Sequence, residues 1–186
     1  MKNKKLNLKL KNILNKENRT LEEAFQLYDK LETIKIEEII GLWKGSSFPT
    51  GNILDGLLEK FNWFGKEFVD KDNVNPLVFL DNQRKRFNVD PSKIPIGFLN
   101  KVKRKEIKNT NLLKNIFLIL KFKTNKSSAR LSMIEYRGKI SVAMIYDNLP
   151  IIDIFRKIDQ NTLLGVMDMK SQKPFFFMLK REESTI

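Results

Sequence analysis

The sequence contains no histidine and no cysteine, and these two absences exclude several classes of function. Neither a Ser-His-Asp nor a Cys-His nucleophile arrangement is available to the chain. The usual ligands of a protein zinc site are missing, and no disulfide can form. Any acid–base chemistry would fall to Asp, Glu, Lys or Tyr. We therefore expect no metal and no cofactor.

Long apolar runs are also absent. No run exceeds five residues, the length of Ile116–Leu120, whereas a helix needs roughly 20 apolar residues to cross a bilayer. Lysines interrupt the apolar stretches near the N-terminus, so no secretory signal is recognised there. These features predict a cytoplasmic protein.

The net charge of +13 is concentrated in two segments. Residues 1–19 carry seven basic side chains and one acid, and residues 84–126 carry thirteen basic and two acidic ones. Three explanations stay open: coding bias with solvated surface charges, peripheral contact with an anionic membrane, and nucleic-acid binding. Nucleic acid is the least favoured, because the basic middle segment has few aromatic side chains to stack on bases.

Glycine and tryptophan gather in residues 41–68, which read GLWKGSSFPTGNILDGLLEKFNWFGKEF. This stretch holds five of the eight glycines and both tryptophans. Glycine is used where the backbone turns sharply or comes close to another group. Tryptophan supplies a large apolar contact and one N–H that needs a partner. The combination indicates a close-packed corner or the mouth of a pocket.

The N-terminal half predicts a mixture of short elements. Thr20 and Glu23 form a capping box, which predicts a helix from 20 to about 33. Apolar spacing predicts a second helix, and three runs read as strands. The second helix is expected at 52–61 and the strands at 39–44, 64–69 and 77–80. Residues 112–122 fit a strand or a helix.

The C-terminal third predicts an antiparallel meander. Its five strand-like runs are 129–136, 139–147, 151–157, 162–169 and 174–181. They are apolar on both faces, whereas a sheet with one wet face alternates apolar with polar side chains. A sheet that curls round an interior and carries helices outside explains this pattern. The predicted fold is mainly β, a single antiparallel barrel of about eight to ten strands with two or three short covering helices.

The predicted domain organisation follows these patterns. Residues 1–19 form a basic N-terminal tail, and residues 20–186 form one barrel domain. Within the barrel domain we distinguish a first part (20–80), a basic connection (81–125) and the strand meander (126–186).

Two sets of motifs resemble known families. The first comprises Gly41-Leu-Trp43-Lys-Gly45, Phe48-Pro49-Thr50-Gly51, Leu54-Asp55-Gly56, Trp63-Phe64-Gly65-Lys66 and Asn75-Pro76-Leu77. The second includes Glu135-Tyr136-Arg137-Gly138-Lys139, the run from Met144 to Asp153, Phe155-Arg156 and Pro174-Phe175-Phe176-Phe177. The chain thus resembles the GXWXG domain joined to domain of unknown function 4334, which implies a small lipocalin-like (calycin-like) barrel. In that family a histidine often precedes the Phe-Arg pair, where this chain has Ile154.

Our leading hypothesis is a non-enzymatic barrel that binds a hydrophobic or amphiphilic small molecule, such as a fatty acid or phospholipid. The apolar strand faces and the resemblance both motivate it. An anionic headgroup would be held by Lys66, Arg130 or Arg156, because such cations pair with carboxylate or phosphate. The other candidate ligand-binding residues are Trp43, Phe48, Trp63, Met144, Tyr146, Asp153 and Phe176.

Alternatives to this hypothesis remain open. An enzyme acting on a small hydrophobic substrate would use Asp153 and Tyr146 as an acid–base pair, and a nucleic-acid binder would use residues 84–126. The basic tail, residues 1–19, would bring a lipid-binding barrel to an anionic membrane. In a purely structural interpretation, the charged residues pair to fix strand register, and the aromatic and methionine side chains fill the barrel.

Overall fold

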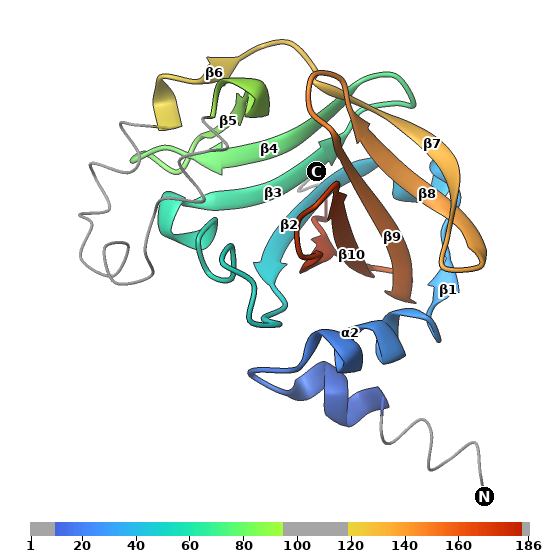
Figure 1. Cartoon of the computed structure of the whole chain (residues 1–186). Helices are drawn as coiled ribbons and strands as arrows, with labels where there is room; N and C mark the ends of the chain where they lie inside the picture. The colour runs from blue at the N-terminus through green and yellow to red at the C-terminus, as the bar shows by residue number, and fades with distance from the viewer. Residues whose placement is uncertain (1–9, 95–118, 184–186) are drawn as a thin grey trace, which may run out of the picture.

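The computed structural model of the chain describes residues 10–94 and 119–183 and shows a closed barrel (Figure 1). Its strands follow the order β3-β2-β11-β10-β9-β8-β7-β4, and β3 also pairs with β4, so these eight strands form a ring. Neighbouring strands in the ring are antiparallel. The predicted fold class, an antiparallel barrel with a few short helices, is confirmed.

The elements lie in the chain as follows. A helical segment at 10–15 precedes α2 (Leu21–Tyr28) and α3 (Ile36–Ile39). The ring strands are β2 (Gly41–Ser47), β3 (Trp63–Phe68), β4 (Val74–Leu80), β7 (Ala129–Tyr136), β8 (Lys139–Tyr146), β9 (Ile151–Asp159), β10 (Thr162–Met169) and β11 (Phe175–Arg181). Outside the ring, β1 (Glu32–Thr33) pairs with β9, β5 (Arg86–Val89) pairs with β4, and β6 (Lys123–Thr124) pairs with β5. Short 3₁₀ turns are η1 (Glu59–Phe61) and η2 (Pro91–Lys93).

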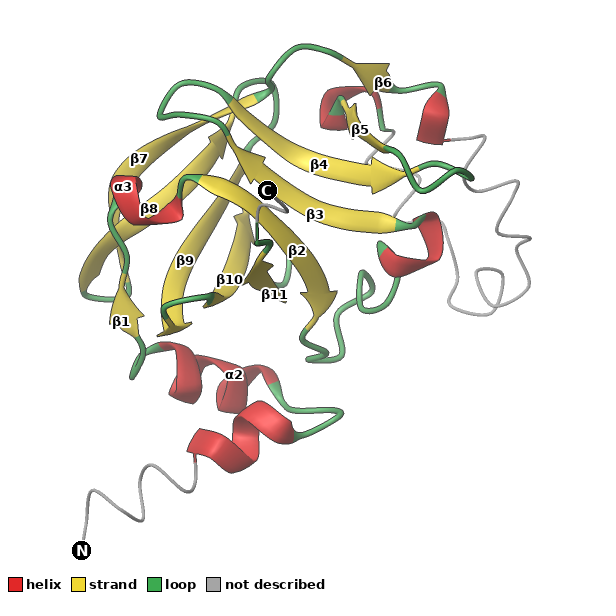
Figure 2. Ribbon diagram, turned by 180° about the vertical axis from the view of Figure 1, so that it is seen from behind, coloured by secondary structure: helices red, strands yellow, loops and turns green. Residues whose placement is uncertain are grey.

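The C-terminal strands form the meander that the sequence predicts. β7, β8, β9, β10 and β11 lie side by side in chain order, joined by short turns. Their observed bounds agree with the predicted runs to within two residues. Figure 2 shows these strands curving round one side of the barrel, with α2 lying across its lower edge in that view.

The capping box predicted at Thr20 is present at the start of α2. The Thr20 hydroxyl accepts a hydrogen bond from the Glu23 amide at 3.1 Å, and the Glu23 carboxylate accepts one from the Thr20 amide at 3.0 Å. The helix ends at Tyr28, earlier than predicted, because the chain then turns so that Glu32 and Thr33 can pair with β9. α3 follows directly, and β2 begins at Gly41 rather than at 39.

The helix predicted at 52–61 is wrong, because this stretch consists of turns that end in η1. Asp55 is one reason: a single oxygen of its carboxylate accepts hydrogen bonds from the amides of Thr50, Gly51 and Asn52, at 3.0, 2.8 and 2.8 Å. Such side-chain-to-backbone bonds fold residues 50–55 into a local loop, which replaces the first turn of a regular helix. The positive φ of Gly56, 71°, also breaks the helical path.

Both faces are buried over the central parts of β8, β9, β10 and β11, as the sequence pattern predicts, whereas β7 has several exposed side chains. The inner side chains, including Met144, Phe155 and Phe177, belong to the barrel core. The outer ones, Ala143, Ile154, Leu164, Val166 and Phe176, pack against α2 and the helical segment at 10–15. In the described residues no helix is long and apolar enough to span a membrane.

Two glycines of the segment at 41–68 permit close contact between β2 and β3. A Cβ atom at Gly45 would lie 2.1 Å from the indole ring of Trp63. Gly65 has a φ of +153°, and a Cβ atom there would lie 1.9 Å from the carbonyl oxygen of Trp43. Gly45 therefore lets the Trp63 ring lie on the backbone of β2, and Gly65 lets the backbones of β3 and β2 approach closely.

Gly65→Ala should destabilise the fold by roughly 3 kcal/mol or more, because it adds a clash with backbone to a strained dihedral that alone costs about 1–3 kcal/mol. Gly51→Ala is a matched control: its φ is +82°, and its Cβ atom would meet no atom within 4 Å. That control should lose only about 1–2 kcal/mol. Urea unfolding of both variants measures the difference, and equal losses would contradict the assigned contact.

Candidate functional site

The two ends of the barrel are built differently. At one end, α3 and the start of β2 close the ring: the Trp43 indole N–H donates to the carbonyl of Ile39 at 2.7 Å, and the Arg181 guanidinium lies 4.2 Å from the centre of the Trp43 ring. The antiparallel order places the β2–β3, β8–β9 and β10–β11 connections together at the opposite end. We call that opposite end the loop end.

Three polar side chains meet inside the barrel, one each from β3, β8 and β9. The Lys66 ammonium lies 2.8 Å from the Asp153 carboxylate and donates to the carbonyl of Pro76 at 3.1 Å. The Tyr146 hydroxyl donates to the same carboxylate oxygen at 3.3 Å. The side chains of Lys66 and Asp153 are only 4% and 1% exposed, so water hardly screens their attraction.

Burial sets the protonation behaviour of this group. It raises the pKa of Asp153 above its ordinary value, while the Lys66 ammonium opposes the shift. Burial and the Asp153 carboxylate hold the pKa of Tyr146 well above its ordinary value. Tyr146 is therefore a neutral hydrogen-bond donor and is poorly suited to act as a base.

Two buried polar atoms beside this group have no hydrogen-bond partner within the described part of the chain. They are the indole nitrogen of Trp63 and the second carboxylate oxygen of Asp153. A buried polar atom left without a partner costs about 1–3 kcal/mol. The Lys66 ammonium lies 2.8 Å from the other Asp153 oxygen and 6.0 Å from the centre of the Trp63 ring, so the two side chains adjoin the same ammonium. This region can offer a donor and an acceptor to a bound molecule.

Apolar side chains at the loop end pack against the same barrel core. Those that are partly buried and pack against the barrel core there include Leu54, Leu58, Phe61, Leu149, Met167 and Met169. They come from the β2–β3, β8–β9 and β10–β11 connections and from the adjoining end of β10. A few polar groups within a largely apolar lining are typical of small-molecule sites.

Of the ten residues predicted to bind ligand, six lie in the barrel interior and four lie elsewhere. Trp63, Lys66, Tyr146 and Asp153 lie close together in the interior. Met144 also faces the interior, opposite Asp153 in the β8–β9 register, and Trp43 lies toward the closed end.

The other four predicted residues lie elsewhere. Phe48 and Phe176 pack together on the outside of the barrel, with ring centres 6.1 Å apart. Arg130 is exposed, and its guanidinium lies 3.8 Å from the Asp147 carboxylate. Of the three cations expected at a headgroup, the structure places only Lys66 in the interior.

Arg156 is fully buried between the outer barrel face and α2. Its guanidinium donates to the carbonyls of Tyr136 and Lys139, at 2.9 and 3.4 Å, and lies 5.3 Å from the centre of the Tyr28 ring. No carboxylate pairs with it among the residues that the structure describes. Arg156 therefore joins the β7–β8 hairpin to the helix that covers it.

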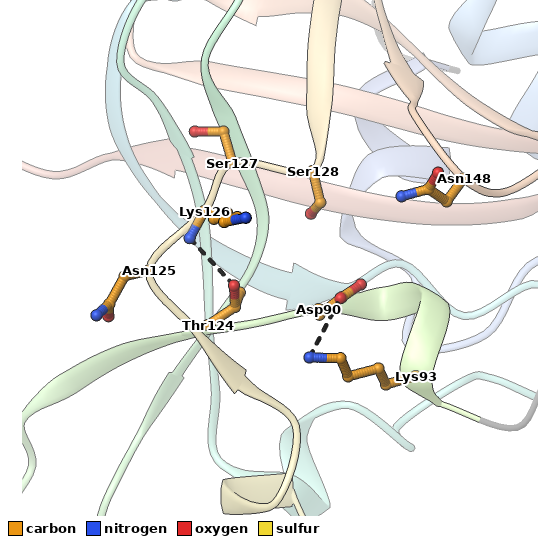
Figure 3. Close-up of a pocket in the computed structure, with 8 residues that line it drawn as sticks. All are labelled: Asp90, Lys93, Thr124, Asn125, Lys126, Ser127, Ser128 and Asn148. Carbon is orange, nitrogen blue, oxygen red and sulfur yellow. Dashed lines mark hydrogen bonds and ion pairs between the residues drawn. The ribbon is translucent and has the colours of Figure 1, made fainter.

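A polar pocket of about 460 Å³ also lies at the loop end, where β6 leads into β7 (Figure 3). Its lining consists of two lysines, three hydroxyl residues, two asparagines and one aspartate. They are Lys93, Lys126, Thr124, Ser127, Ser128, Asn125, Asn148 and Asp90. Five of them lie in the basic segment 84–126, but none was predicted to bind a small molecule, although the polar run at 124–128 directly before a predicted strand was the available signal.

The structure describes only part of the basic segment 84–126, the segment that a nucleic-acid binder would use. Residues 84–94 and 119–126 are described, and the rest of the segment lies outside the described residues. Lys93 and Lys126 of the polar pocket come from its two visible parts.

Comparisons with known proteins agree with this architecture. Residues 26–83 match the model of the GXWXG protein family, and residues 127–181 match that of a domain of unknown function, DUF4334. A crystal structure of a protein from Thermomonospora curvata is similar, with a TM-score of 0.69 and 28% sequence identity. The similarity covers 96% of this chain and 99% of that one. No curated protein matches the chain.

The buried ion pair makes a prediction about coupling. Asp153→Asn and Lys66→Met should each destabilise the protein by about 3–5 kcal/mol, because each leaves one charge buried without its partner. The double variant should lose clearly less than the sum of the two. Urea unfolding at pH 7 of the wild type, both single variants and the double variant gives the coupling energy. Additive losses would mean that the two side chains do not act as a pair.

Proposed function

We propose that this chain, in which a GXWXG region and a DUF4334 region close one barrel, binds a small hydrophobic molecule at the loop end. The observation that carries the proposal is the presence of two unpartnered buried polar atoms, the Trp63 indole nitrogen and one Asp153 oxygen. Both lie in an interior that is otherwise apolar apart from Lys66 and Tyr146. A ligand that supplies their missing hydrogen bonds would be stabilised there.

The chemistry of the two atoms indicates the polar part of the ligand. The indole N–H needs an acceptor, and the carboxylate oxygen needs a donor. A hydroxyl group can act both as an acceptor and as a donor, so it suits either atom. Because Asp153 already neutralises the Lys66 ammonium at 2.8 Å, a neutral group is favoured over a carboxylate at this position. We therefore propose a lipid-like molecule whose neutral polar group is held inside the barrel.

The apolar part of the ligand would contact the partly buried side chains of the loop end. Met167 and Met169 are suited to this role, because methionine is unbranched and adapts to irregular apolar shapes. Leu54, Leu58 and Phe61 come from the turns at 52–61, which pack on the core without forming a regular helix.

A second candidate function is an enzyme that uses Asp153 and Tyr146. The hydrogen bond between them and the adjacent Lys66 ammonium favour it. The geometry supports it less well than binding, because the Tyr146 hydroxyl already donates a hydrogen bond to Asp153 and the raised pKa of Tyr146 disfavours the phenolate.

Binding can be tested with 1-decanol and a pair of tryptophan variants. Trp63→Phe removes the unpartnered N–H and keeps an aromatic ring. It should weaken 1-decanol binding about fivefold, the effect of losing one hydrogen bond worth about 1 kcal/mol. Trp43→Phe is the matched control, because the Trp43 N–H is already bonded to Ile39 at the other end of the barrel. Titration calorimetry measures both affinities.

The same titrations distinguish a ligand with a neutral polar group from one with an anionic group. Decanoate should bind the wild type more weakly than 1-decanol, and a preference for decanoate would instead favour an anionic group beside Lys66. Equal affinities of the Trp63→Phe variant and the wild type would remove Trp63 from the site. If neither probe binds, and native mass spectrometry of the purified protein finds no co-purified amphiphile, the proposed function is wrong.

A further inference from the structure

The polar pocket at the loop end is lined by donors that the fold itself does not use. The Lys126 ammonium and the side chains of Ser127, Ser128 and Asn148 form no hydrogen bond or ion pair with the residues that the structure describes. Figure 3 shows Lys126, Thr124, Ser127 and Ser128 on one connecting segment, with Asn148 on the opposite side. These groups are therefore available to a ligand.

The charge of the lining favours an anion over a metal ion. Two lysines outnumber one aspartate, and no group of metal-binding side chains occurs in the described residues. Asp90 is already engaged: its carboxylate accepts bonds from the amide and hydroxyl of Ser92, at 3.0 and 2.6 Å, and lies 3.6 Å from the Lys93 ammonium. Burial raises the pKa of Asp90, but the hydrogen bonds from Ser92 and the charge of Lys93 lower it by more, so the net shift is downward. The Asp90 carboxylate is therefore charged, and Lys93 partly balances that charge.

The backbone beneath the pocket is fixed by the barrel. The Ser128 amide donates to the carbonyl of Val74 at 3.1 Å, and the Asp147 amide donates to the carbonyl of Ser128 at 3.0 Å. The Asp90 amide donates to the carbonyl of Phe122 at 2.9 Å. The strands that begin or end here thus hold the lining segments in place before any ligand arrives, which lowers the entropic cost of binding.

The lining residues also adjoin the barrel core along the chain. Ser128 precedes buried Ala129, Asn148 precedes Leu149, and Lys93 precedes Ile94, and all three of these apolar neighbours belong to or pack against the barrel core. The pocket therefore lies beside the apolar surface of the loop end. A molecule with an anionic group and an apolar chain could contact both.

We propose that this pocket binds a phosphate group. Phosphate offers several acceptor oxygens and a negative charge, which match the ammonium of Lys126, the nearby hydroxyls and the amide of Asn148. The described parts of the basic segment 84–126, residues 84–94 and 119–126, carry seven basic side chains and one acid, and this excess would raise the local concentration of such anions. The bound group is free phosphate, the phosphate group of a small ester, or the phosphate headgroup of an amphiphile.

Lys126→Gln tests the pocket directly, because it removes one charge from an exposed side chain and should leave the fold intact. Lys180→Gln is the control: this lysine is also exposed but lies on β11 outside the pocket. Inorganic phosphate and decyl phosphate are titrated into each protein at pH 7 and low salt by calorimetry, with thermal unfolding as a check on folding. Lys126→Gln should weaken binding about tenfold, the effect of losing a charge-assisted hydrogen bond, and Lys180→Gln should not.

The outcomes distinguish the ligand sources and separate this inference from the proposed function. Equal affinity for the two probes, with sensitivity to Lys126→Gln, identifies a site for free phosphate or short esters. Decyl phosphate binding at least tenfold more tightly, with the same sensitivity, identifies a headgroup site. The inference is overturned if neither probe binds, or if both lysine variants weaken binding equally, which would indicate attraction by net charge alone. Phosphate binding that persists where 1-decanol fails to bind would contradict only the proposed function.

Discussion

Closure of the sheet is the constraint on which the rest of the structure depends. Once β3 pairs with β4, every ring strand has one face turned toward a shared interior that water hardly reaches. Any charged side chain on that face must then find a partner there, because an unpaired buried charge is costly. Lys66 and Asp153 meet this requirement across the barrel, with Tyr146 bonded to the same carboxylate oxygen. The polar group in the interior is thus a direct consequence of ring closure.

The glycine–tryptophan segment shows how closure is achieved locally. Gly45 and Gly65 allow β2 and β3 to approach closely and give the Trp63 ring a place on the backbone. Trp43, two residues before Gly45, closes the other end through its bond to Ile39. The two tryptophans therefore differ in how their indole N–H groups are bonded. The Trp43 N–H donates to the carbonyl of Ile39, whereas the Trp63 N–H has no partner in the described residues. Only the Trp63 N–H is therefore free to bind a ligand.

The loop end combines two kinds of surface. Inside the ring, a donor and an acceptor lie within an apolar lining, and beside it a polar pocket carries two lysines and several hydroxyl groups. The sequence analysis identified Trp63, Lys66, Tyr146 and Asp153 because polar residues within apolar runs stand out. It grouped them with Arg130, Arg156, Phe48 and Phe176, which lie on the outside of the barrel. The polar pocket was not predicted, because its residues are of types common in turns. They form a lining only because the segments after β5, between β6 and β7, and between β8 and β9 lie together in the fold.

The sequence by itself determined the class of this protein: an antiparallel barrel, five C-terminal strands in order, buried faces on both sides, and no histidine or cysteine chemistry. These features depend on local periodicity and composition, which do not require knowledge of distant contacts. Only the tertiary structure decided which face of each strand points inward, and therefore that Lys66 pairs with Asp153 while Arg156 lies under α2. It also decided that residues 52–61 form turns, since the Asp55 carboxylate there binds the backbone amides. Register and ring closure join residues far apart in the chain, and periodicity within one strand does not specify those partners.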